Sequence, residues 1–278
     1  MSSSFLRGRT APLFAASATI LIALAGGIFA QPPAGGGRGA AAVRTPEQQA
    51  PEDLTGYWVS IVTEDWRFRM VTPAKGDYAS VPLNAAGRKV ADTWDPAKDE
   101  ASGNACKSYG AAAIMRVPGR INVTWQDGNT LKVEMDAGTQ TRLFHFGPEP
   151  ATIEPSLQGY SVATWEAPPP GRGGRGPGGP PPPPPAPVGA QNQRAGSLKV
   201  VTTHLKPGYL RKNGVPYSDK ATVTEYHSRT NEPNGDSWLV DTTIVDDPTY
   251  LAQPFITSTH FKHQANNAGW APSACEAK

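Results

Sequence analysis

Alternation of apolar and polar positions is the main pattern along the chain, and it predicts a protein built from β-strands. Residues 121–126 (Ile-Asn-Val-Thr-Trp-Gln) alternate, turn at Asp127-Gly128-Asn129 and continue through 131–135. An Asp-Gly pair between two alternating runs indicates a β-hairpin. We expect further strands at residues 54–58, 139–146, 160–165, 198–205, 221–227, 238–245 and 255–261.

A single stretch has the period of a helix. It follows Pro82, ends at Asp95-Pro96, and repeats apolar residues at Leu83, Ala86, Val90, Ala91 and Trp94. Strands at short intervals with turn residues between them are typical of a sheet that closes on itself. The sequence therefore predicts a mainly β fold, an antiparallel meander forming a lipocalin-like or related barrel, with one short helix.

The first 30 residues have the pattern of a secretory signal peptide. Arg7 and Arg9 precede an uncharged run over residues 11–30, which ends in small residues before Gln31. We expect residues 1–30 to be cleaved, leaving no stable membrane anchor and a periplasmic or extracellular protein. A retained anchor is the alternative, since the apolar run approaches membrane-spanning length.

Two segments lack any apolar period. Residues 31–52 are rich in Ala, Gly, Pro and Gln, and residues 167–196 combine Gly-Arg repeats with the proline run 180–185. Such compositions cannot bury a core, so we predict a disordered leader and a Pro/Gly-rich loop. Because both flanks of the loop are predicted strands, residues 54–278 are expected to form a single β domain that the loop interrupts.

The charge balance excludes some partners. The chain has 26 basic and 24 acidic residues, and Arg7 and Arg9 leave with the signal peptide. The mature chain is then balanced, which gives no electrostatic case for binding nucleic acid. Residues 167–218 contain no Asp or Glu but seven basic residues, including Arg211 and Lys212. We interpret them as a solvated basic loop, with a partner-binding patch as the alternative.

The two cysteines, Cys106 and Cys275, are both retained in the mature chain. In an oxidising compartment two cysteines favour one disulfide bond, here linking the last residues to the first third of the domain. A catalytic thiol or a metal ligand is the alternative, although no His lies nearby at a recognisable spacing.

Several short motifs occur in a fixed order along the domain. They are Trp94-Asp95-Pro96, Cys106 with Gly110, Met115 and Pro118, Gly214 with Tyr217-Ser218, Thr224-Glu225-Tyr226, Asp247-Pro248, Pro254-Phe255 and Cys275-Glu276. In this order they resemble a large family of secreted, β-rich proteins from soil and other environmental bacteria. The opening Gly56-Tyr57-Trp58 also resembles lipocalin-like barrels, in which the Trp closes one end. These resemblances imply the fold, export and the disulfide, and no particular chemistry.

The candidate catalytic residues are Glu225 and His227. They share one face of a predicted strand, because side chains alternate along a strand. A carboxylate and an imidazole together could serve as a general base or as metal ligands; the alternative is a polar pair on a solvent-exposed face. His260 and His263 fall on opposite faces, so we expect no metal site, and we expect no cofactor.

The candidate ligand-binding residues centre on Arg142, which shares a face with Phe144. Inside a barrel its guanidinium would need acceptors. It could anchor an anionic or carbonyl ligand, or it could pair with a carboxylate such as Glu134 or Glu225. The other residues expected at the ligand are Trp125, His204 and Tyr209.

These observations leave three hypotheses for function. The first is a secreted or periplasmic barrel that binds a small, partly apolar ligand, since seven Trp and eight Tyr suit such a pocket. The second is a cofactor-independent hydrolase, lyase or isomerase that uses Glu225, His227 or Arg142. The third is an envelope interaction module. The sequence lacks the motifs of common serine hydrolases, zinc proteases and P-loop enzymes, and it leaves the oligomeric state open.

Overall fold

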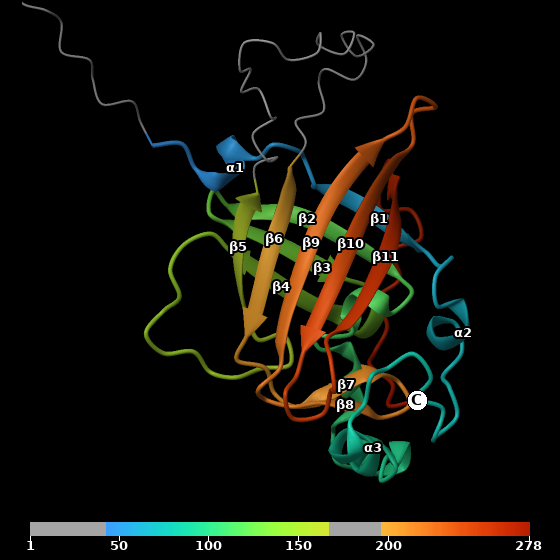
Figure 1. Ribbon diagram of the computed structural model, residues 1–278. Helices are drawn as coiled ribbons and strands as arrows, with labels where there is room; N and C mark the ends of the chain where they lie inside the picture. The colour runs from blue at the N-terminus through green and yellow to red at the C-terminus, as the bar shows by residue number, and fades with distance from the viewer. Residues whose placement is uncertain (1–42, 167–195) are drawn as a thin grey trace, which may run out of the picture. The chain divides into compact units, whose positions relative to one another are not determined.

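The computed structural model describes residues 43–166 and 196–278, which are built around a closed β-barrel (Figure 1). The predicted signal peptide, most of the predicted leader and the Pro/Gly-rich loop lie outside these residues. The nine strands pair in the order β1-β11-β10-β9-β6-β5-β4-β3-β2, and β1 pairs with β2 to close the ring. Their bounds are β1 Gly56–Ile61, β2 Arg120–Asp127, β3 Thr130–Met135, β4 Gln140–His145, β5 Tyr160–Glu166, β6 Ser197–Thr203, β9 Thr222–Asn231, β10 Ser237–Asp246 and β11 Phe255–Gln264.

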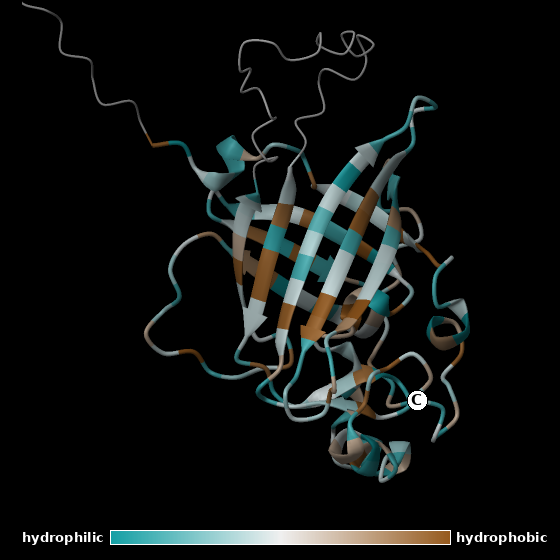
Figure 2. Cartoon of the chain, viewed as in Figure 1, coloured by the Kyte–Doolittle hydropathy of each residue, from teal (hydrophilic) through white to brown (hydrophobic). Residues whose placement is uncertain are grey.

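The prediction of a mainly β, barrel-type fold is confirmed. Each strand expected from the alternating pattern is present, with its ends shifted by a few residues at most. Figure 2 shows the cause, because hydrophobic and hydrophilic positions alternate along the strands. Such alternation buries one face of a strand inside the barrel and leaves the other toward solvent.

The strand order departs from a simple antiparallel meander at one point. β4 and β5 pair in parallel, whereas the other neighbouring strands of the barrel are antiparallel. Parallel neighbours cannot be joined by a tight turn, because the chain must return to the starting edge. Residues 146–159 make this return as the wide yellow-green loop of Figure 1.

The predicted helix is present as α3 (Ala85–Ala91), which Asn84 caps by accepting a hydrogen bond from Gly87 N–H at 2.9 Å. Three other short α-helices occur in the described part of the chain, so the prediction of one helix was too low. They have only four to six residues each, too few to repeat an apolar face. These are α1 Pro46–Gln49, α2 Trp66–Arg69 and α4 Pro96–Ala101, and the 3₁₀ helices are η1 Ala105–Tyr109, η2 Ile114–Arg116 and η3 Ala137–Thr139.

A small second layer packs at one end of the barrel. It is the two-stranded sheet of β7 (Gly208–Arg211) and β8 (Val215–Tyr217), and its core includes Leu210 and Val215 together with Leu83 of the α3 segment. Gly214 makes the β7–β8 turn with a φ of +78°, and a Cβ there would lie 2.1 Å from the Trp94 side chain. Only glycine satisfies both the turn and the contact. The chain leaves the barrel after β6, forms β7 and β8, and returns at the same end as β9, which pairs with β6.

The opposite end is covered by residues that we expected to be disordered. Trp165 donates from its indole N–H to Pro46 O at 2.9 Å, and Glu52 accepts from Arg229 N–H at 3.0 Å. The predicted leader of residues 31–52 therefore includes an ordered part, residues 43–52. Its capping box at Thr45 shows that a local helix signal was present in the sequence.

The expected disulfide joins Cys106 to Cys275. It attaches the last residues to η1, where Glu276 N–H also donates to the Tyr109 hydroxyl at 3.3 Å. No helix among the described residues is both long enough and apolar enough to span a membrane.

Candidate functional site

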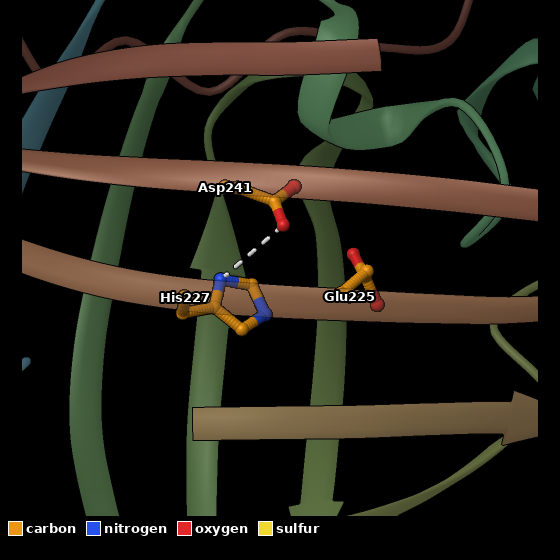
Figure 3. Close-up of side chains that lie close together, drawn as sticks. All are labelled: Glu225, His227 and Asp241. Carbon is orange, nitrogen blue, oxygen red and sulfur yellow. Dashed lines mark ion pairs between the residues drawn. The ribbon is translucent and has the colours of Figure 1, made fainter. Parts of the chain in front are cut away.

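Four ionisable side chains meet inside the barrel, and we call Arg142, Glu225, His227 and Asp241 the interior cluster. Each occupies an inward position of its strand, and each is buried. The pairing of β9 with β10 sets His227 opposite Asp241, and Figure 3 shows these two side chains facing one another beside Glu225. The structure thus brings together the candidate residues Arg142, Glu225 and His227 and adds Asp241, which the sequence analysis did not single out.

Arg142 and Glu225 form a bidentate ion pair. The two guanidinium Nη atoms lie 2.6 and 2.5 Å from the two carboxylate oxygens, and both side chains are 0% exposed. Thr202 Oγ1 accepts a further hydrogen bond from Arg142 at 3.2 Å. Of the two roles predicted for Arg142, pairing with an internal carboxylate is the one seen: both Nη atoms are bonded, and Nε alone has no hydrogen-bond partner among the described residues.

Burial determines the charges of the other two members. It raises the pKa of Asp241 well above its usual range, and the nearby charge of Glu225 acts in the same direction. Burial also lowers the pKa of His227 to about 4. Burial therefore favours the uncharged forms of both Asp241 and His227, while Arg142 and Glu225 face one another as an ion pair.

A first prediction tests this charge assignment. A group whose pKa rises on folding stabilises the fold less as pH increases, because the folded state must keep a proton that the unfolded chain releases. Asp241→Asn should therefore be more stable than wild type at pH 8, and the difference should vanish near pH 4. It should grow by about 1.4 kcal/mol per pH unit until the pKa of the folded group is reached.

Urea denaturation at several pH values measures this effect. The matched control is Asp246→Asn, on the same strand but exposed, which removes the same charge without removing a buried group. If Asp241→Asn instead costs stability at neutral pH and this cost shrinks on acidification, Asp241 is ionised in the fold and paired with a charged His227.

The interior cluster also has the donor types of a metal site. Ligand atoms of Glu225, His227 and Asp241 lie within 4.8 Å of one another. His227 Nε2 and Asp241 Oδ1 have no hydrogen-bond partner among the described residues, although Asp241 Oδ1 lies 3.6 Å from His227 Nδ1 (dashed line in Figure 3). Arg142, however, binds both oxygens of Glu225, and its charge would oppose a divalent cation at this distance. The arrangement fits a buried ion pair with two further polar groups beside it better than a metal centre.

Space beside the cluster is small. The cavity that Phe144 and His227 line inside the barrel has a volume of about 10 Å³, which is the minimum for one water molecule. The remaining predicted ligand residues lie elsewhere. Trp125 packs on Phe146 near α1, His204 is exposed at the end of β6, and Tyr209 donates to Asp99 at 2.7 Å.

A larger recess lies outside the barrel, and we call it the arginine cleft. Its volume is about 250 Å³, and it opens to solvent. Three regions that are distant in sequence form it: the end of α2 with the following residues, the stretch from η1 through η2 to Pro118, and the end of β7 with Lys212. The lining residues are Phe68, Arg69, Met70, Val71, Thr72, Ser108, Ala113, Arg116, Val117, Pro118, Leu210, Arg211 and Lys212.

Two guanidinium groups in this lining have unused donors. Arg211 donates from Nη1 to Ala79 O at 2.6 Å, while its Nε and Nη2 have no partner among the described residues. Arg116 donates from Nη2 to Asp65 at 3.0 Å, and its Nη1 is likewise unpaired there. Both side chains are nearly buried, 4% and 6% exposed. A buried, charged donor without an acceptor is costly, so each would be stabilised by an added acceptor.

The charge of the cleft points in the same direction. Its lining contains four basic residues and no acidic one. Arg69 pairs with Glu64 and Arg116 pairs with Asp65, but no acidic partner within ion-pair distance of Arg211 occurs in the described structure. Burial, and then the charge of Arg116, lower the pKa of Arg211 to about 10. It remains protonated at neutral pH, and an anion would relieve the repulsion.

The sequence analysis missed this site. It noted Arg211 and Lys212 only as part of an acid-free stretch and did not single out Arg69 or Arg116. One signal was available, since Arg116 stands within the apolar run Ile114-Met115-Arg116-Val117 and Arg211 follows Tyr209-Leu210. An arginine inside an apolar segment is often buried and therefore needs acceptors.

Comparison of the chain with protein-family models, with curated proteins and with solved structures finds no match.

Proposed function

We propose that this chain is a secreted or periplasmic β-barrel protein that binds a small, partly apolar organic anion in the arginine cleft. The observation that carries the proposal is that Arg116 and Arg211, two nearly buried guanidinium side chains, both line an open recess and both keep buried N–H donors without a hydrogen-bond partner among the described residues. A guanidinium fork matches the geometry of a carboxylate or phosphate.

The cleft has the other properties of a small-molecule site. A few polar groups stand among mainly apolar neighbours, which include Phe68, Val117 and Leu210. The guanidinium carbon of Arg211 lies 4.0 Å from the centre of the Phe68 ring, which holds the fork in place. Ser108 adds a hydroxyl oxygen that has no partner in the described structure.

The barrel interior supports binding or catalysis less well. Arg142, Glu225 and His227 do converge there, as an enzyme would require, but the cavity beside them has room for about one water molecule. Glu225 also occupies both Nη atoms of Arg142, which leaves only its Nε without a hydrogen-bond partner among the described residues. We therefore assign the interior cluster to the stability of the fold and the arginine cleft to function.

Calorimetric titration with three probes of similar size tests this proposal. Hexanoate should bind the wild-type chain, whereas hexanamide and hexylammonium should bind at least tenfold more weakly, because only the carboxylate pairs with the guanidinium groups. Arg211→Gln should weaken hexanoate binding by tenfold or more. The matched control is Arg88→Gln on α3, which removes the same charge from an exposed position away from the cleft.

Two results would contradict the proposal. One is equal binding of hexanoate and hexanamide, and the other is an Arg211→Gln variant, shown by circular dichroism to be folded, that binds hexanoate as wild type does. Ser108→Ala provides a second variant that removes no charge. It should weaken hexanoate binding without changing the preference over hexylammonium.

A further inference from the structure

The arginine cleft continues into the main exposed apolar surface of the described chain. Six large hydrophobic side chains are exposed among the described residues, and three of them fall within residues 66–71. Trp66, Met70 and Val71 are 63%, 60% and 66% exposed. Met70 and Val71 also line the cleft with Arg116 and Arg211. Anion donors and exposed apolar side chains therefore share one recess.

The segment that carries these side chains is held firmly. Arg69 is 9% exposed, donates to Arg116 O at 2.8 Å and to Ser60 Oγ at 3.0 Å, and pairs with Glu64. Met70 N–H donates to Trp66 O at 2.9 Å, so Trp66 and Met70, four residues apart, lie on the same side of the α2 turn. The contacts of Arg69 thus hold the segment in place while the side chains of Trp66, Met70 and Val71 stay exposed.

The size of the recess limits what it can enclose. A volume of about 250 Å³ is roughly eight times the ~30 Å³ that one water molecule takes up in the liquid. A carboxylate with a short alkyl chain would fill it. A longer chain would leave the recess along Met70 and reach Trp66, which lies next to Met70 but does not line the cleft.

We propose, resting on the proposed function, that the occupant is a single-chain anionic amphiphile, with its anionic head at Arg116 and Arg211 and its alkyl chain across Met70, Val71 and Trp66. Charge complementarity places the head, since every charged residue of the lining is basic. Burial of otherwise exposed apolar surface favours the chain. An anion without a chain would leave this surface in water, and an uncharged lipid would leave the donors unpaired.

The experiment is a chain-length series of monomeric alkyl carboxylates, from butanoate to dodecanoate, titrated below their micellar concentrations. The dissociation constant should fall with each added methylene by up to about fourfold, and it should level off once the exposed side chains are covered. Met70→Gln combined with Val71→Thr should flatten this dependence. Ile256→Thr, at another exposed hydrophobic residue outside the cleft, should leave the whole series unchanged.

The results separate this inference from the function on which it rests. Equal binding of butanoate and dodecanoate would overturn the amphiphile and leave anion binding standing. Failure of every carboxylate to bind would overturn anion binding itself. A third arm uses phosphatidylglycerol vesicles. The inference would be overturned in favour of docking on an anionic bilayer by two results together. The protein would cosediment with the vesicles unless Trp66→Ser is present, and its affinity for monomeric carboxylates would not depend on their chain length.

Discussion

Replacing Arg142 by alanine should lower the free energy of unfolding by about 3–5 kcal/mol. The substitution leaves Glu225 charged or forces it to take up a proton inside the barrel, where it is 0% exposed and has lost both partners of its carboxylate oxygens. Removing one member of a buried ion pair is costly for this reason, whatever the net contribution of the pair. Urea denaturation at pH 7 measures the change.

Two further variants give this prediction its contrast. Arg142→Met combined with Glu225→Leu removes both charges and fills the space, so it should be near neutral or stabilising relative to wild type. Lys132→Ala breaks the half-exposed pair of Lys132 with Glu134, whose atoms are 3.2 Å apart on the adjacent strand β3. Exposed pairs contribute about 1 kcal/mol or less.

A double variant as unstable as Arg142→Ala would show that the pair specifies the fold beyond its charge balance. A loss below about 1 kcal/mol for Arg142→Ala would show that water reaches Glu225. Either result would also make the barrel interior a candidate active site again, because our assignment of the interior cluster to stability depends on its being closed to solvent.

The strands could be predicted from the sequence because their information is local. A period of two is visible within five or six residues, and the Asp-Gly turn between β2 and β3 fixes that hairpin. The same local pattern set Glu225 and His227 on one face of β9. The alternating pattern could not show that this face of β9 points into the barrel, because charged residues at alternate positions usually face solvent. Only the partner, Arg142 on β4, decides it.

The elements that were missed depend on contacts between distant residues. β7 and β8 are short, contain Gly208 and Pro216, which weaken a strand pattern, and are held in place by packing at the end of the barrel. The arginine cleft combines residues near 70, 116 and 211 that share no period. The sequence supplied its charges but had no local feature that could bring them together.

Removing the disulfide by Cys106→Ser with Cys275→Ser should lower the free energy of unfolding by about 2–5 kcal/mol. The cysteines are 169 residues apart, and the chain-entropy model gives about 5 kcal/mol for so long a loop, as an upper figure. The expected cause is a more expanded unfolded state, so the denaturant m-value should rise together with the loss of stability.

The native contacts around the bond make the cause testable. Ser273 N–H donates to Asp136 O at 2.9 Å and Ala277 N–H donates to Glu100 at 2.8 Å, so the C-terminal residues should stay in place without the bond. The variant should then keep the wild-type circular dichroism and bind hexanoate normally at 20 °C, as should wild type in reducing agent. If hexanoate binding fails while the barrel stays folded, the bond acts through η1, because Ser108 of the arginine cleft is two residues from Cys106.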